Sequence, residues 1–547
     1  MAWHIFKKDF VLLWPVVLLS ALAQFGLNAL MFAADNDPQS QYLLLTARLS
    51  VIVVFLAIGL AIALAVHQDP IPGTRQDWLI RPIRRRDLLV AKLLFVLLAV
   101  QLPMFLGDLA EALSHGFALQ DALTAALGRN LYVLVTLSLP AFGIAAMTRS
   151  PAQTIGVGVV YFIAVVAATF LLSSVARIGG QEQATNPLAW TGVAWIEQSA
   201  SRAVLAAGAV VVLLLLYLKR RLVLAWSLFP AFAALSALAI LLPWSWLFAV
   251  QEAAAASPSA AQAIRVALEP AAPRYRPPPG SSSDDYAIGA AQVQLRGRSA
   301  GDITEENRIR RSRGDVTVFA PVSFRGLPAG AMPWADRAAV TLVQDGKVVF
   351  EGRGDDLKLN PAPSGQTARG GYEAIRIPAL VFEVARGKPS TLTIDYSLTL
   401  LTPQPAVRAA ALGADVQAPG LGRCTSGRDS DGDDIELRCL SLARTPSCLA
   451  VTLEDGRTGQ RNPENLICAP DYSPYSSRSF PDAINRFEIE APFRDRFGVG
   501  RYPVTGAQLG QARLILTRYE PVVHLTRRVT ASQVRLADWT ADPGASR

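Results

Sequence analysis

The sequence predicts a multidomain protein in which a polytopic α-helical membrane domain precedes an all-β, sandwich-like soluble domain. The chain has 547 residues, of which 51% are hydrophobic and 18% charged. It is too long for one ordinary domain and too apolar for a purely soluble protein. Long apolar runs end near residue 250, and the four cysteines all follow them. We therefore expect a membrane domain (1–250), a linker rich in Ala, Pro and Ser (251–285) and an extracytoplasmic β domain (286–547).

About seven apolar runs are long enough to cross a bilayer, because a helix of about 20 residues spans the hydrocarbon core and satisfies its own backbone. The first run exceeds the length of a signal-peptide core and other runs follow it, which indicates an uncleaved anchor. The last run contains Pro230 and Pro243, so a re-entrant hairpin is its alternative. The predicted spans are 11–33, 43–66, 88–110, 131–147, 155–172, 204–218 and 222–250.

Orientation is predicted from the positions of Lys and Arg, which membrane proteins concentrate in cytoplasmic loops. A cytoplasmic N-terminus places most of the cations near the spans inside, and an odd number of spans then places the β domain outside. The net charge of +8 reflects this bias, so we expect no nucleic-acid partner. The predicted location is the bacterial cytoplasmic membrane, with the C-terminal domain periplasmic or extracellular.

The loop between the second and third predicted spans is the most distinctive stretch of the first half. Thr74 and Asp77 resemble a helix-capping pair, and Asp87 can cap the third span. A short surface helix is expected there, with Trp78 and Leu79 as apolar contacts inside a ring of arginines. The alternative is that these arginines only set topology and bind anionic headgroups.

The order of parts resembles the permease subunits of type-2 ABC exporters. It comprises a basic N-terminal segment, two spans, the loop Pro-Gly-Thr-Arg-Gln-Asp-Trp-Leu followed by Arg-Pro-Ile-Arg-Arg-Arg-Asp-Leu-Leu-x-Ala-Lys, and four further spans, within residues 1–220. In that family this loop corresponds to a coupling helix that docks on a separate ATP-binding subunit. The resemblance implies the same role for Thr74, Arg75, Asp77, Trp78, Leu79, Arg81, Arg84, Arg85 and Arg86.

The N-terminal segment 1–10 also resembles a part of that family, its connecting helix. Trp3, Phe6 and Phe10 fall on one helical face, and Lys7 and Lys8 provide charge, which is typical of an interfacial helix. A seventh span and a large outer domain depart from the family pattern of six spans. Because of these two departures, the resemblance does not identify the substrate.

ATP hydrolysis requires a phosphate-binding loop, and no Gly-x-x-x-x-Gly-Lys-Ser/Thr motif occurs in the sequence. The chain is therefore not expected to be an enzyme or to bind a cofactor itself. The resemblance implies ATP and magnesium through a partner P-loop ATPase, together with a second permease copy or paralogue and the lipid bilayer as partners.

Ionisable residues within predicted spans are candidates for function, because a buried charge is costly in a membrane. Asp108 and Glu111, near the outer end of the third span, are the candidate gating or substrate residues; the alternative is that they lie at headgroup level. Gln24, Asn28 and Gln101 are expected to form hydrogen bonds between helices.

Alternating patterns predict strands in the last 250 residues or so. The clearest is 391–401, and 340–344 and 347–350 flank Asp345-Gly346, a two-residue hairpin signal. A short helix is expected near 260–268, within the linker. The other predicted strands are 316–324, 374–384, 449–453, 487–490, 513–519 and 529–536.

An even number of cysteines outside the cytoplasm predicts disulfides among Cys424, Cys439, Cys448 and Cys468, with three pairings open. No metal site is expected, since only four histidines occur and the cysteines lack zinc-site spacing. A weak calcium candidate is the acidic run containing Asp429, Asp431, Asp433 and Asp434.

The leading functional hypothesis is a membrane-spanning permease subunit that couples ATP hydrolysis by a separate subunit to substrate export. The alternative is a non-transporting envelope protein, whose helix bundle anchors or transmits motion to an outer β interaction domain.

Overall fold

The computed structural model describes residues 1–36, 41–69, 84–178, 193–254, 258–275, 315–353, 371–428, 434–442, 448–462, 464–468, 484–493, 503–506 and 508–540. The chain divides into two compact units. The helical unit comprises Met1–Glu182, Ile196–Pro243 and Ser479–Ile484, and the β unit comprises Gln183–Trp195, Trp244–Arg478 and Asn485–Arg547.

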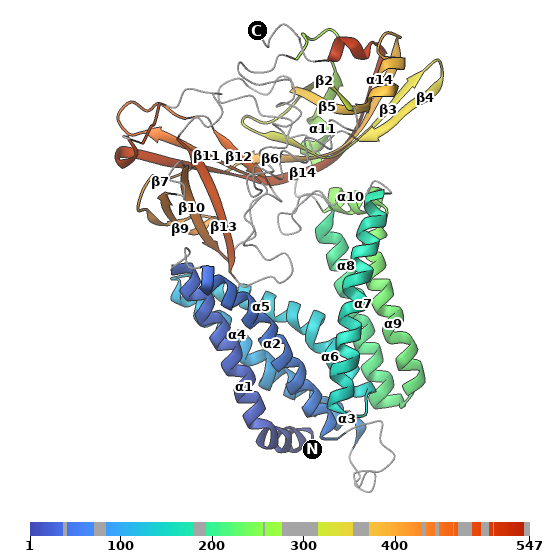
Figure 1. Cartoon of the computed structure of the whole chain (residues 1–547), viewed down its shortest axis with the longest axis vertical. Helices are drawn as coiled ribbons and strands as arrows, with labels where there is room; N and C mark the ends of the chain where they lie inside the picture. The colour runs from blue at the N-terminus through green and yellow to red at the C-terminus, as the bar shows by residue number, and fades with distance from the viewer. Residues whose placement is uncertain are drawn as a thin grey trace. The chain divides into compact units, whose positions relative to one another are not determined.

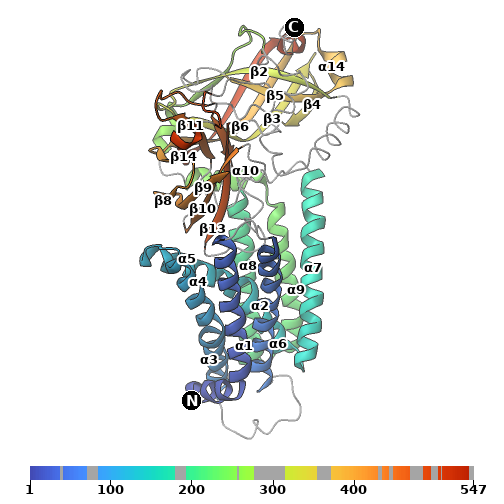
Figure 2. The ribbon, with the colours of Figure 1, turned by 60° about the vertical axis from the view of Figure 1, so that its left-hand side comes forward.

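The described part of the helical unit is built from long apolar helices, seen in Figures 1 and 2. The third long helix, Arg85–Ser114, and the fourth, Leu119–Met147, each contain a short π-helix. The elements are α1 (Ala2–Asn36), α2 (Gln41–His67), α3 (Arg85–Phe95), η2 (Val96–Gln101), α4 (Leu102–Ser114), α5 (Leu119–Val133), η3 (Leu134–Ser138), α6 (Leu139–Met147), α7 (Pro151–Ile178), α8 (Ala194–Leu214), η4 (Leu215–Lys219) and α9 (Leu222–Leu238).

Six of the described helical segments are long and apolar enough to cross a membrane. Large apolar side chains on their outer faces, such as Leu19, Leu56 and Phe162, are exposed. An extensive apolar surface of this kind is costly in water and suits lipid. The helices are therefore compatible with a multi-pass membrane protein. The six segments are Ala2–Asp35, Leu49–His67, Arg85–Ser114, Leu119–Met147, Pro151–Ala168 and Trp195–Lys219.

The predicted seventh span, 222–250, is wrong as one continuous helix. Helix α9 has only 17 residues and passes into a 3-10 turn, Ala239–Leu241. Leu242 is then extended, with ψ 138°, because the residue before a proline is disfavoured in the helical region. A new helix, α10 (Trp244–Ala253), begins after Pro243 and belongs to the β unit.

The first helix is longer than predicted, since α1 begins at Ala2 and the interfacial segment 1–10 is its first part. Figures 1 and 2 show these first turns lying at an angle to the remainder of α1. Pro15 lies inside the helix and has no N–H group to complete the hydrogen-bond ladder, which accounts for a bend.

The described residues of the β unit form three antiparallel sheets. One has the order β1-β2-β5 and one the order β13-β10-β9-β8, while the largest has the order β12-β11-β14-β6-β3-β4 with β7 also paired to β14. The bounds are β1 (Arg265–Leu268), β2 (Asp315–Arg325), β3 (Met332–Gln344), β4 (Lys347–Arg353), β5 (Gly371–Pro378), β6 (Ser390–Pro403), β7 (Val407–Ala410), β8 (Asp415–Ala418), β9 (Gly422–Arg428), β10 (Asp434–Ser441), β11 (Cys448–Asp455), β12 (Asn465–Cys468), β13 (Asn485–Pro492) and β14 (Ala512–Val534).

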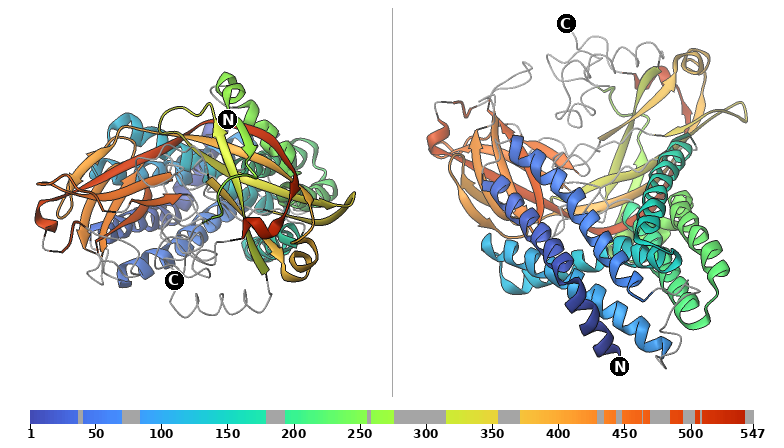
Figure 3. Two further views of the ribbon diagram at one scale, coloured as in Figure 1. Left: turned by 90° about the horizontal axis from the view of Figure 1, so that it is seen from above. Right: turned by 60° about the horizontal axis from the view of Figure 1, so that its bottom comes forward.

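One long strand links the two halves of this unit. The predicted strand 513–519 and residues 529–534 of the predicted strand 529–536 belong to the single 23-residue strand β14, which Figure 3 shows in red. The last part of the second prediction is wrong, since a 3-10 turn begins at Leu536. The pairing of β14 with β6 shifts register between Pro521 and Val523 and again between Ala531 and Val534. Such bulges bend a strand, so β14 can take part in two separate cores.

Each half of the largest sheet packs against one of the smaller sheets. The first core joins β2 and β5 to β3, β6 and the end of β14, through residues such as Val318, Ile375 and Leu392. The second joins β9, β10 and β13 to β11 and the start of β14, through Leu437, Leu453 and Leu514 among others.

Of the strands and turns predicted for this unit, some are confirmed and others are wrong. The 391–401 alternation is confirmed by β6, where Leu392, Ile394 and Leu398 are buried. The hairpin at Asp345-Gly346 is also confirmed, since both residues have positive φ. The strand 374–384 is wrong beyond Pro378, where the helix α14 (Ala379–Ala385) begins.

The segment expected as a linker contains ordered elements. The helix α11 (Pro258–Ala263) is followed by β1, which pairs antiparallel with β2 through Val266 and Phe324. The predicted helix 260–268 is therefore wrong in its second half. Alternation in this strand is too short to be recognised from the sequence alone.

Candidate functional site

Four charged side chains converge where α1, α2 and α3 meet, beside the ends of the 70–83 loop. Lys92 Nζ donates to Asp9 Oδ2 at 2.7 Å, to the Ala65 carbonyl oxygen at 2.7 Å and to Asp69 Oδ2 at 3.0 Å. Lys8 Nζ donates to both Asp69 oxygens, at 3.0 and 3.1 Å. We refer to Lys8, Asp9, Asp69 and Lys92 as the Lys92 cluster.

Burial makes this cluster energetically important. The Lys92 side chain is 1% exposed and that of Asp9 is 0% exposed, whereas Lys8 is 53% exposed. Two ammonium groups face two carboxylates, so the formal charges balance. Two ions in a dry site persist only when paired and hydrogen-bonded, because each loses its hydration on burial.

Asp69, the member of the Lys92 cluster next to segment 70–83, is held in its ionised form. Burial alone raises the pKa of Asp69, but the charge and hydrogen bond of Lys92, with the hydrogen bond of Lys8, outweigh it and lower that pKa. Asp69 therefore stays ionised at neutral pH. It fixes the end of α2 at the point where the 70–83 loop begins.

Further hydrogen bonds surround the same helix ends. Arg85, at the start of α3, donates from Nη1 to the Leu218 carbonyl oxygen at the end of η4, at 3.1 Å. His67 Nε2 lies 2.9 Å from Thr154 Oγ1, and Thr148 Oγ1 lies 2.6 Å from the same hydroxyl. The described residues on either side of segment 70–83 are thus held by contacts to α1, α3, α7 and η4.

Only part of the predicted coupling loop can be placed. Arg84, Arg85 and Arg86 are exposed at the start of α3, which agrees with an accessible basic surface. Asp87 lies in the first turn of α3 rather than at its cap, so the predicted capping role is wrong. Thr74, Arg75, Asp77, Trp78, Leu79 and Arg81 lie outside the described residues.

The N-terminal aromatic residues form a contiguous stack. The Trp3 and Phe6 rings lie 4.9 Å apart and those of Phe6 and Phe10 lie 5.9 Å apart. Phe6 is buried, whereas Trp3, Phe10 and Lys7 are exposed. This leaves an aromatic and basic surface, the arrangement that an interfacial segment uses.

Asp108, a candidate gating residue, is enclosed in a polar contact between helices. It is ion-paired with Arg129 of α5 and accepts a hydrogen bond from Asn28 Nδ2 of α1 at 3.3 Å. The Cβ of any side chain at Gly107 would lie 2.7 Å from Asn28 Nδ2, so glycine permits this close approach of α1 and α4.

Two of the three predicted amide contacts join helices. Asn28 reaches Asp108, and Gln101 Nε2 donates to Ser138 Oγ at 2.7 Å. Gln24 instead donates to Ser20 within the same helix, so that prediction was wrong. Gln101 and Ser138 each end a π-helix, and each is followed two residues later by a proline that cannot extend the α-helical ladder.

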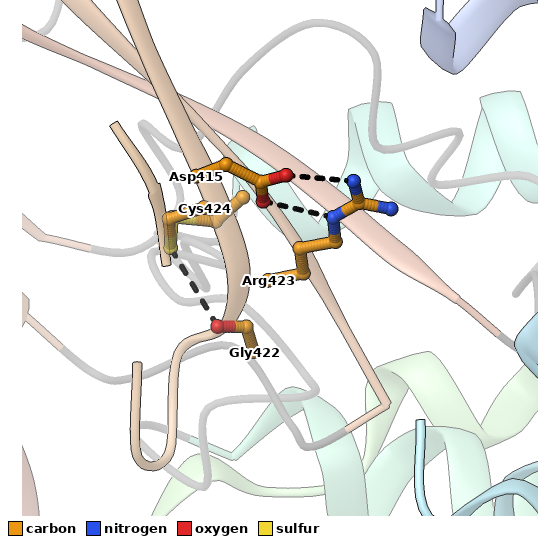
Figure 4. The surroundings of a disulfide bond; sticks show 5 residues. Asp415, Gly422, Arg423 and Cys424 are labelled. Atoms are coloured by element: carbon orange, nitrogen blue, oxygen red, sulfur yellow. Dashed lines mark hydrogen bonds and ion pairs between the residues drawn. A yellow bond between two sulfur atoms is a disulfide. The ribbon is translucent and has the colours of Figure 1, made fainter. Parts of the chain in front are cut away.

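The disulfides of the β unit join neighbouring strands. Cys424 of β9 and Cys439 of β10 are bonded, with a Cα–Cα distance of 4.1 Å (Figure 4). Cys448 is also disulfide-bonded, and the register of β11 with β12 places Cys468 opposite it. Of the weak calcium candidates, Asp434 is buried at the start of β10, and Asp429, Asp431 and Asp433 lie outside the described residues.

A buried polar chain joins α10 to the sheets of the β unit. Trp195 Nε1 donates to Gln251 Oε1 at 3.3 Å, and Gln251 Nε2 donates to His524 Nδ1 at 2.9 Å. The same His524 nitrogen lies 2.8 Å from Thr399 Oγ1, whose hydroxyl is also bonded to Asp336. These hydrogen bonds attach α10 to strands β6 and β14 of the β unit.

His524 should make stability depend on pH. Burial lowers its pKa to about 4 from an unfolded value of 6.5. Between these values the unfolded chain binds a proton that the folded chain excludes, so stability falls as the pH falls. We expect a loss of about 2 kcal/mol between pH 7 and pH 5 from this residue. Thermal unfolding of the full chain and of His524→Asn at both pH values checks this, because the variant should lack that part of the dependence.

The sequence did not reveal the Lys92 cluster as a site. A lysine inside an apolar span and an aspartate inside the first helix were signals that a buried ion pair was needed. Neither residue indicates its partner, since Asp9 and Lys92 are separated by most of two helices.

Comparison of the chain with protein-family models, curated proteins and solved structures found no match.

Proposed function

We propose that this chain is the permease subunit of an ABC-type exporter and couples ATP hydrolysis by a separate P-loop ATPase to substrate movement. The observation that carries the proposal is the Lys92 cluster. Through it, the residues before and after the 70–83 loop are tied to α1, α2 and α3 by hydrogen bonds of Lys92.

Held helix ends on both sides of segment 70–83 would let a force applied there reach the helices. Asp69 lies just before the loop, and Arg84–Arg86 follow it at the exposed start of α3. A movement applied to the loop therefore acts on several helix ends together instead of bending one flexible connection. Closure of an ATPase dimer would bias the helices between two arrangements in proportion to its differential affinity for them.

The permease functions in the bacterial cytoplasmic membrane, with its N-terminus and loop in the cytoplasm, and pairs with a second permease copy or a paralogue. The β unit is a sandwich-like binding or assembly module outside the cytoplasm, where disulfides are stable. ATP and magnesium act only through the partner ATPase.

Trp78→Ala tests the docking surface directly. Buried tryptophans are frequent hot spots at interfaces, so the substitution should weaken binding of the ATPase subunit about 10-fold or more. The measurement is the dissociation constant between the purified ATPase and the full permease in nanodiscs. Substrate-coupled ATPase activity should fall in parallel.

Arg149→Ala is the matched control, because Arg149 is an exposed cation in the short α6–α7 connection, on the same predicted side of the membrane. It should retain wild-type affinity. Equal affinities for wild type, Trp78→Ala and Asp77→Ala would contradict docking through the 70–83 loop.

A second function is transmission of ATPase-driven motion to the β unit without transport. It is favoured by α10, which follows the 3-10 turn after α9 by two residues and is bonded to β14 through Gln251 and His524. A helix movement would reach the sheets through this covalent and hydrogen-bonded connection.

Transport assays separate these two functions. Both chains would be reconstituted in vesicles, and ATP-dependent accumulation of candidate amphipathic substrates would be measured beside hydrogen exchange in α10. Exchange that changes with ATP while no substrate accumulates favours motion transmission, and accumulation favours the permease.

A further inference from the structure

A second cluster of ionisable side chains lies at the C-terminal ends of α1 and α4. The ligand atoms of Asp35, Glu111 and His115 all lie within 4.8 Å of one another. Glu111 lies in the last turn of α4 and His115 is the C-cap residue four positions later, so the two side chains emerge on the same side of the helix end. Asp35 comes from the last turn of α1.

His115 is a buried imidazole whose two ring nitrogens make no hydrogen bond. Its side chain is 1% exposed. Nε2 lies 3.2 Å from Asp35 Oδ2, yet the contact lacks the direction of a hydrogen bond. A buried imidazole that makes no hydrogen bond is costly, and such groups in native proteins call for an explanation.

The distance between His115 Nε2 and Asp35 Oδ2 also suits two ligands of one metal ion. In a tetrahedral site with metal–ligand distances of about 2.0–2.1 Å, ligand atoms lie about 3.3 Å apart. The 3.2 Å between His115 Nε2 and Asp35 Oδ2 matches this value. Two carboxylates would also balance the charge of a divalent cation in this largely buried place.

Neighbouring contacts hold the three ligands in position. The Phe32 ring packs against the His115 ring with centroids 4.7 Å apart, which limits rotation of the imidazole. About two turns before Asp35 in α1 and one turn before Glu111 in α4, Asn28 bonds to Asp108 across the close approach at Gly107. The α1–α4 spacing is therefore set independently of any ion, as a pre-formed site requires.

We propose that Asp35, Glu111 and His115 bind a divalent transition-metal cation, for which Zn²⁺ is the best candidate. Imidazole nitrogen combined with carboxylate oxygen favours zinc over calcium or magnesium, which take oxygen ligands. Three protein ligands leave a fourth position for water. The bound ion would clamp the ends of α1 and α4 together, so this site is independent of the Lys92 cluster and of the proposed ATPase coupling.

Zinc content of the full chain provides the test. The protein, purified in detergent through a tag without histidines, is equilibrated with Zn²⁺, separated from free metal by gel filtration and measured by elemental analysis. We expect about one zinc ion per wild-type chain. His115→Ala should lose it, and Glu111→Gln should bind at least 10-fold more weakly, because each removes one ligand.

His4→Ala is the control variant, since His4 is exposed in the first turns of α1 and lies in a different part of the chain. It should keep wild-type zinc content and the same zinc-dependent rise in unfolding temperature. Glu111 is only partly buried, so Glu111→Gln decides the matter should His115→Ala fail to fold. A wild-type chain that retains no zinc, or equal zinc in wild type and Glu111→Gln, overturns the proposal.

Discussion

Replacing Lys92 with methionine should lower the free energy of unfolding by about 3–5 kcal/mol, because it removes the buried partner of Asp9 and Asp69 and leaves both carboxylates only the exposed Lys8. Methionine keeps much of the side-chain volume, so the loss reports charge and hydrogen bonds rather than a cavity. The measurement is thermal unfolding of the full chain in detergent, read from tryptophan fluorescence. ATPase stimulation should be lost at the same time if the cluster couples the loop to the helices.

Lys8→Met provides the matched control. Lys8 bonds to the same Asp69 but is 53% exposed, so its removal should cost less than about 1 kcal/mol. The double variant Asp9→Asn with Lys92→Met should recover part of the loss, since it removes the charge on both sides of the pair. Equal effects of Lys8→Met and Lys92→Met would show that the cluster behaves as a surface ion pair.

Removing the disulfide between Cys424 and Cys439 should lower the free energy of unfolding of the β unit by about 3 kcal/mol, the value for a closed loop of 15 residues. The bond restricts the unfolded chain, and it also fixes β9 against β10 in the second core. The measurement is thermal unfolding of the Cys424→Ser, Cys439→Ser double variant. Removing both residues avoids leaving one free thiol.

Arg423→Ala is the control beside this disulfide. Arg423 donates two hydrogen bonds to Asp415, at 3.0 and 2.9 Å, from a surface position next to Cys424 (Figure 4). Hydrogen bonds from Arg423 lower the pKa of Asp415, but the pair is exposed, so its loss should cost less than about 1 kcal/mol. A similar cost for both variants would mean that the disulfide contributes little.

Local sequence patterns were reliable where one element determines its own structure. Apolar runs long enough for membrane helices, the alternation that buries Leu392 and Ile394, and the Asp345-Gly346 turn all depend on neighbouring residues. Errors occurred at boundaries. Pro243 ends the seventh run and Pro378 ends β5, each because the chain changes direction sooner than hydropathy alone indicates.

The sequence by itself determined that an apolar helical half precedes a β half and that four cysteines lie in the second. Only the tertiary structure decided which groups meet: Lys92 with Asp9 and Asp69, His115 with Asp35, and Cys424 with Cys439. The physical reason is that helix packing and strand register bring together residues far apart in the chain. A local pattern shows that a charge will be buried, but the partner depends on how the helices and strands are placed.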